Sequence, residues 1–98
     1  MNRERLLPDR VMSDIVRFAK EAEVSVVILF GSRARGTNTS RSDIDLAVRG
    51  GDFDRFYWNI KDNTHSLLMF DVVDLDHGVS DELASEIRRD GVGLYEKD

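Results

Sequence analysis

Two aspartates at alternate positions carry the clearest chemical signal in the sequence. Asp43 and Asp45 flank the apolar Ile44, a pattern typical of a strand with one buried face. Alternate residues of a strand point to the same side, so the two Cα atoms would lie about 6.6 Å apart with both carboxylates on one face. Hard divalent cations prefer oxygen ligands. The pair can therefore converge on one or two metal ions.

A third carboxylate, Asp71, stands inside the otherwise apolar run of residues 68–73. An ionised carboxylate in a buried strand is costly unless it is paired or binds a cation. A metal shared with Asp43 and Asp45 would compensate for that burial, and a structural ion pair with an arginine is the alternative. Asp74 competes for the same role, but it would point to the other side of a continuing strand, so strand parity favours Asp71.

A Gly31-Ser32 pair precedes these carboxylates, and ten residues separate Ser32 from Asp43. The apolar run before the pair, residues 24–30, is typical of a buried strand that delivers a turn at its end. Glycine lets the backbone approach a ligand closely, and serine offers a hydroxyl and a backbone N–H to a phosphate oxygen. The turn is therefore a candidate phosphate site.

The segment after the turn is basic. Arg33, Arg35 and Arg41 fall within nine residues of a chain whose formal net charge is −5. An acidic chain is poorly suited to bind a long nucleic acid, whereas one basic loop suits a small polyanion. Arg33 or Arg35 could neutralise triphosphate charge, and the spacing does not choose between them. Ser42 could hold the loop or contact a phosphate.

Each of these features also has an ordinary explanation. An Asp-x-Asp pair can be solvated, a Gly-Ser pair can be a simple turn, and three arginines can be surface charge. Their occurrence together, in this order and on these expected elements, favours a site for a polyphosphate and divalent metal.

Composition and length narrow the class of protein. The chain has 98 residues and no cysteine, so a disulfide, a thiolate zinc site and a cysteine nucleophile are excluded. We expect one domain spanning residues 1–98. The chain lacks an apolar run long enough for a membrane span or a signal peptide, so we expect a cytoplasmic protein without a membrane partner.

Hydrophobic periodicity predicts an α/β (α+β) fold, a mixed β-sheet with flanking helices. Helices are expected over residues 11–22, after an Asp52 cap and after a Ser80 cap. Strands are expected over residues 24–30, 43–48, 67–73 and 92–95, with residues 31–42 forming a loop and Gly91 a plausible end of the last helix.

The residues of this motif resemble those of a known family. Residues 31–36, Gly-Ser-Arg-Ala-Arg-Gly, followed by residues 42–46, Ser-Asp-Ile-Asp-Leu, resemble the signature of the minimal nucleotidyltransferases. This family belongs to the DNA polymerase β-like nucleotidyltransferase superfamily, whose pattern is Gly-Ser, ten residues, Asp-x-Asp and a distant third aspartate. Residues 87–95 also look like the family's usual ending, and the resemblance covers about residues 11–95.

The resemblance implies a polymerase β-like nucleotidyltransferase fold and transfer of a nucleoside monophosphate to an acceptor hydroxyl. It implies ATP as substrate and two Mg²⁺ ions held by Asp43, Asp45 and Asp71, the expected catalytic residues. The expected nucleotide-binding residues are Gly31, Ser32, Arg35 and Ser42.

Minimal members of the family resemble antitoxins paired with an all-helical HEPN protein. The resemblance therefore implies that the chain adenylylates a HEPN-type toxin partner on a tyrosine hydroxyl. Two alternatives remain open: transfer to a small molecule, and a binding module that neutralises its partner by contact alone. The aromatic cluster Phe53, Phe56, Tyr57 and Trp58 could serve such contacts or fill the core, with Trp58 the expected exposed member.

Overall fold

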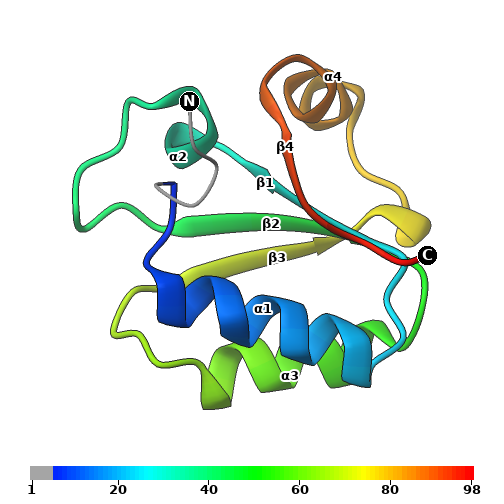
Figure 1. Ribbon diagram of the computed structural model, residues 1–98. Coiled ribbons are helices and arrows are strands. Elements are labelled where there is room, and N and C mark those ends of the chain that lie inside the picture. The colour runs from blue at the N-terminus through cyan, green and yellow to red at the C-terminus, as the bar shows by residue number, and fades with distance from the viewer. Residues whose placement is uncertain (1–5) are drawn as a thin grey trace.

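The computed structural model describes residues 6–98, which form a mixed sheet between helices (Figure 1). The predicted order of helices and strands is confirmed, with two short helices added. In chain order the elements are α1 (Asp9–Glu21), β1 (Val26–Phe30), α2 (Ser32–Arg35), β2 (Ile44–Arg49), α3 (Phe53–Asn63), β3 (Phe70–Asp74), the 3-10 helix η2 (Leu75–His77), α4 (Asp81–Asp90) and β4 (Val92–Glu96).

The sheet has the strand order β3-β2-β1-β4. Strand β1 pairs antiparallel with both β2 and β4, whereas β2 and β3 are parallel, so the predicted mixed sheet is confirmed. The register places Asp45 opposite Phe30 of β1 and Asp71 of β3. Two segments far apart in the sequence therefore meet at one end of the sheet.

One face of the sheet packs on α1 and α3, which lie side by side below it (Figure 1). Ile44, Leu46 and Val48 of β2 point into this layer and are buried. They meet apolar side chains such as Ile15 of α1 and Phe56 of α3, both fully buried. Burying one such side chain contributes about 1.5–3 kcal/mol, so this layer is the main core.

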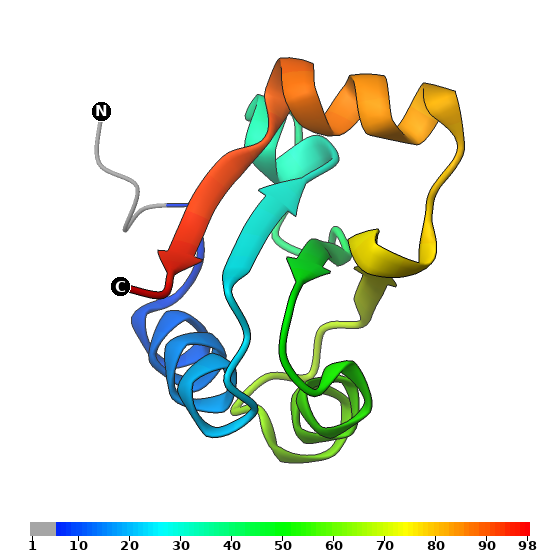
Figure 2. The ribbon, with the colours of Figure 1, turned by 90° about the vertical axis from the view of Figure 1, so that its right-hand side faces the viewer.

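The other face carries α4, which crosses the top of the sheet in Figure 2, and the short helix η2. A smaller cluster of Phe30, Ala47 and Ile87 fills the space beneath α4. Side chains alternate along β2, so Asp45 lies on the same face as Ala47. The thin cover on this face leaves room for polar side chains at the end of the sheet.

The predicted helix starts are confirmed by their caps. The Asp52 carboxylate accepts the N–H of Arg55 at 3.1 Å, and the Ser80 hydroxyl accepts the N–H of Leu83 at 3.1 Å. Each bond satisfies one of the free N–H groups that open a helix. Among the aromatic residues of α3, Phe56 is buried and Trp58 is 59% exposed, as expected.

The prediction of a long buried strand over residues 67–73 is wrong at its start. Strand β3 begins at Phe70, and the preceding Leu67 and Met69 are exposed. Asp71 is exposed as well, so burial does not force this carboxylate to find a partner. The physical reason is that β3 is an edge strand, with β2 on one side only.

The expected loop of residues 31–42 contains the short helix α2, which the sequence pattern did not predict. Gly31 begins it with φ +78°, and Gly36 ends it in the left-handed conformation. Both positions suit glycine, which lacks the Cβ that disfavours positive φ. Within residues 6–98, no helix is both long enough and apolar enough to span a membrane.

A buried carboxylate ties α1 to the segment that leads into β3. Asp14 is only 3% exposed. Its carboxylate accepts hydrogen bonds from the backbone N–H and from the ring Nδ1 of His65, each at 2.8 Å. Arg17 donates to the same carboxylate at 3.0 Å. Burial acts to raise the pKa of Asp14, but the bonds from His65 and Arg17 outweigh it and lower that pKa below 3.8.

We predict that Asp14→Ala lowers the free energy of unfolding by about 2–3 kcal/mol at pH 7, because hydrogen bonds to a buried charge are lost. Urea unfolding measures this difference. The contribution of Asp14 to stability should fade as the pH falls below 3.8, because the carboxylate then becomes protonated and its hydrogen bonds to His65 and Arg17 weaken. Glu21→Ala is the control, since this exposed residue should change stability by less than about 0.5 kcal/mol.

Candidate active site

Candidate site residues gather at one end of the sheet, where β1 ends and β2 and β3 begin (Figure 1). Asp45 and Asp71 are register partners on neighbouring parallel strands. Asp43 lies just before β2, and Gly31 follows Phe30, the residue paired with Asp45 on the other side. Strand pairing thus brings the glycine turn and the three aspartates to one place.

Gly31 lies directly against the Asp45 carboxylate. A Cβ placed on Gly31 would stand 2.1 Å from Oδ2 of Asp45, far inside contact distance. The positive φ of this residue, +78°, independently favours glycine. The turn therefore brings its backbone against a carboxylate, which suits a ligand that contacts a backbone N–H and a metal together.

The carboxyl group of Asp45 has a strongly raised pKa. Burial, followed by the charges of Asp71 and Asp43, raises the pKa of Asp45 from 3.8 to about 6. Glu86 of α4 adds to the rise, and Arg35 opposes it. Such crowding of negative charge is an electrostatic environment that a divalent cation would relieve.

The donor set fits a hard cation, although the carboxylates are not already drawn into a ligand cluster. Among residues 6–98, no group of three or more acidic or histidine side chains is arranged tightly enough to hold a metal ion. Three carboxylates repel one another without a cation between them. Asp43 and Asp71 are exposed and free to turn toward Asp45, so the residues suit Mg²⁺ through oxygen ligands.

The structure separates the two arginines that the sequence left open. Arg33 is 5% exposed and donates to the carbonyl of Ser42 at 3.1 and 2.9 Å and to that of Ser40 at 3.3 Å. Its guanidinium therefore holds the loop before β2. Arg35 is 40% exposed and donates to Glu86 at 3.2 Å. Arg35 is the guanidinium of this pair that can turn to a bound phosphate.

Two further candidates take part in local hydrogen bonds. The Ser42 hydroxyl accepts the N–H of Thr39 at 2.9 Å, which corresponds to its loop-holding role. Asp74 accepts the N–H of Asp76 at 3.0 Å and so caps η2. Its register partner is Val48, farther along the sheet from the glycine turn, whereas the register partner of Asp71 is Asp45.

Sequence comparison identifies the family. A family model described as "Polymerase beta, Nucleotidyltransferase" matches residues 13–98 of the chain. The chain belongs to this nucleotidyltransferase family. No protein of curated function matches the chain significantly.

Solved structures agree with this assignment. A crystal structure of a toxin-antitoxin with AMP-PNP aligns with a TM-score of 0.68 and 26% identity, over 89% of this chain and 74% of the other. The toxin-antitoxin MntA-HepT aligns with a TM-score of 0.58 and 22% identity, over 88% and 70% of the two chains. The second likeness is evidence for the fold alone.

Sequence analysis of this nucleotidyltransferase missed Glu86. The residue lies on α4, more than forty positions after Arg35, and no motif or spacing connects the two. Its oxygen stands 3.2 Å from the Arg35 guanidinium, and its charge contributes to the raised pKa of Asp45. Only the packing of α4 over the sheet could reveal that it borders the site.

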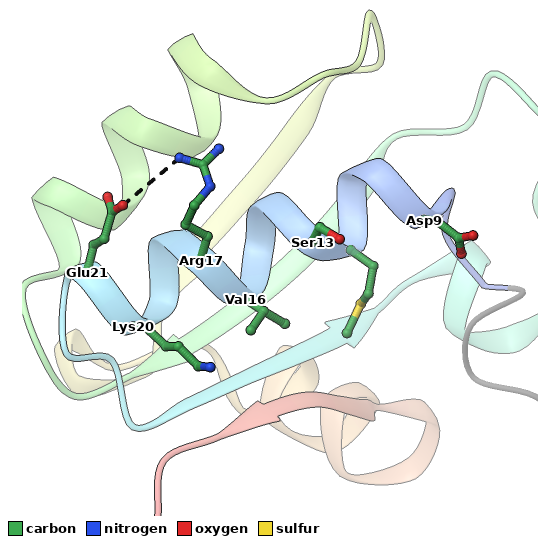
Figure 3. Close-up of a pocket in the computed structure, with 7 residues that line it drawn as sticks. Asp9, Ser13, Val16, Arg17, Lys20 and Glu21 are labelled. Carbon is green, nitrogen blue, oxygen red and sulfur yellow. Dashed lines mark ion pairs between the residues drawn. The ribbon is translucent and has the colours of Figure 1, made fainter.

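A separate hollow of about 660 Å³ runs along α1 (Figure 3). Its lining includes the exposed Arg17 and Glu21, whose charged atoms are 4.0 Å apart, and the half-buried Met12 and Val16. No residue of the glycine turn and none of the three aspartates lines this hollow. The hollow is therefore separate from the candidate active site at the end of the sheet.

We predict that Gly31→Ala reduces Mg²⁺-dependent ATP binding at least tenfold, because the new methyl group displaces the Asp45 carboxylate. Gly36→Ala is a control with the same φ of +78° and open space around its Cβ. Because ψ is 18° at Gly36 but −159° at Gly31, Gly36→Ala should lose about 1–2 kcal/mol of stability and Gly31→Ala should lose more. Calorimetric titration and urea unfolding check both outcomes, and equal ATP affinities in the two variants would contradict the prediction.

We predict that Asp45→Asn stabilises the metal-free protein by about 1–2 kcal/mol at pH 7.5, after allowance for solvent screening. The native pKa of about 6 exceeds the ordinary 3.8, so ionisation of Asp45 opposes folding as the pH rises through 6. The gain should vanish at pH 4. Urea unfolding in chelator measures it, and Asp62→Asn, an exposed change on α3, should show no such pH dependence.

Proposed function

We propose that this nucleotidyltransferase transfers AMP from ATP to a hydroxyl group of a HEPN-type toxin and thereby acts as an antitoxin. The observation that carries the proposal is the contact of Gly31 with Asp45, the register partner of Asp71. This contact places a turn that could bind phosphate next to carboxylates that could bind a metal ion. The aligned toxin-antitoxin structure with AMP-PNP, an ATP analogue, supports both an adenine nucleotide and a toxin partner.

In this proposal Asp43, Asp45 and Asp71 hold two Mg²⁺ ions. When bound, the metal supplies charge neutralisation at the triphosphate and lowers the pKa of the acceptor hydroxyl. Gly31 and Ser32 bind the β- and γ-phosphates through the backbone of the turn and the serine hydroxyl.

The acceptor reaches the site from the side of Asp71, the exposed carboxylate on the edge strand. Its oxygen attacks the α-phosphorus, a new P–O bond forms, and the bond to pyrophosphate breaks. Asp71 takes the proton that leaves the acceptor hydroxyl. Arg35 neutralises charge on the triphosphate and on the departing pyrophosphate.

A contact-only antitoxin is the second candidate. Within residues 6–98, the exposed large apolar side chains are Trp58 (59%), Leu67 (104%) and Met69 (67%). Leu67 and Met69 lie on the segment that leads directly to Asp71, so they favour a protein acceptor over a small molecule. The same surface would serve a partner that binds without being modified.

We predict that a HEPN-domain partner becomes labelled when it is incubated with this protein, Mg²⁺ and ATP carrying a labelled α-phosphate. Asp45→Asn should reduce the labelling rate about 100-fold or more, because a metal ligand is lost while the fold is retained. Asp74→Asn is the matched control on β3, and it should leave the rate nearly unchanged. Gel autoradiography measures the label.

Other outcomes separate the candidates. Neutralisation of the toxin that survives in Asp45→Asn, with no label in any reaction, would favour the contact-only antitoxin. Label in an added small molecule and none in the protein partner would assign a small-molecule acceptor.

A further inference from the structure

Arg35 forms ion pairs with residues of α4. Its Nη1 lies 3.2 Å from Oε2 of Glu86 and 3.9 Å from Oδ2 of Asp90. Asp90 also holds Arg89 at 3.0 Å, so it has a second cationic partner. Among residues 6–98, Glu86 forms its ion pair with Arg35. The pair joins α2 to α4 across the end of β1, where Figure 2 shows α4 passing over the sheet.

This pair borders the candidate active site. Both charges act on Asp45, since Glu86 raises and Arg35 lowers the pKa of that carboxyl. Arg35 is also the last residue of α2, the helix that begins at the Gly31 turn. A triphosphate bound at the turn would therefore lie within the electrostatic reach of Arg35 and Glu86.

The pair is weak enough to be exchanged. The side chains of Arg35 and Glu86 are 40% and 31% exposed, and an ion pair this open to water contributes little to stability. A guanidinium can donate two parallel hydrogen bonds to a phosphate, and such charge-assisted bonds are stronger. A triphosphate also carries more charge than one carboxylate. The guanidinium therefore gains by moving from Glu86 to the nucleotide.

We propose that the Glu86 carboxylate occupies the position on the Arg35 guanidinium that a phosphate of the nucleotide would take. A nucleoside triphosphate then binds by displacing Glu86 from this arginine. The inference rests on the proposed function, because it concerns the same nucleotide site. After the exchange Glu86 is left near the phosphates and Asp45 without its ion pair to Arg35, and the guanidinium of Arg89 remains the cation that feels its charge. Glu86 thus acts as a positioning residue that weakens nucleotide binding and links the state of the site to α4.

We predict that Glu86→Gln binds ATP with Mg²⁺ about two- to fivefold more tightly than the wild type, the range expected when a surface ion pair no longer competes. Calorimetric titration measures the dissociation constants. Glu21→Gln is the matched control, because Glu21 pairs with Arg17 on α1 at 4.0 Å, away from the site. Its affinity should equal that of the wild type.

A double-mutant cycle tests whether Glu86 acts through Arg35. Arg35→Gln alone should weaken ATP binding, and adding Glu86→Gln to it should give a clearly smaller gain than in the wild type. An equal gain in both backgrounds would overturn the exchange and assign Glu86 to simple charge repulsion. Circular dichroism confirms that each variant is folded.

The direction of the effect separates this inference from a structural role. If the ion pair merely braced α2, Glu86→Gln would weaken or not change ATP binding, and the inference would fall while the proposed function stood. If neither the wild type nor any variant bound ATP, the proposed nucleotide site and this inference would fall together.

Discussion

The contact between Gly31 and the carboxylate of Asp45 is the constraint on which the rest of the site depends. Antiparallel pairing of β1 and β2 sets Phe30 opposite Asp45, so the residue after Phe30 must turn across that carboxylate. Only glycine fits, because a Cβ would stand 2.1 Å from Oδ2 and φ is +78°. The same turn starts α2, which carries Arg35 to the rim of the site.

The two faces of the sheet differ in composition: one carries the main apolar core, and the other carries a small apolar cluster and the acidic residues of the candidate site. The face toward α1 and α3 carries the main apolar core, whose side chains are almost completely excluded from water. The face toward α4 has a much smaller apolar cluster around Phe30, Ala47 and Ile87. Charged residues can therefore collect at its end without disrupting the main core, and the chain can retain its fold while it keeps acids close together.

Negative charge is concentrated at that end, and this concentration opposes folding. Asp45 feels its own burial and the charges of Asp71, Asp43 and Glu86, with Arg35 as an opposing cation. A cation bound there would reverse the balance, because it interacts with the ionised form of every carboxylate. Electrostatic strain stored at a site of this kind is typical of residues selected for chemistry rather than for stability.

The sequence by itself determined the order of helices and strands and the caps at Asp52 and Ser80. These features follow from local rules: hydrophobic period and side-chain caps. The sequence also predicted that Gly31 and the aspartates share a site, but it is the pairing of distant strands that brings them together. Only the tertiary structure decided that Asp71 is exposed, since its strand lies at the sheet edge, and that Arg33 is committed to the loop. It alone brought Glu86 to Arg35, because contacts between distant elements depend on how helices pack over the sheet, which no local spacing encodes.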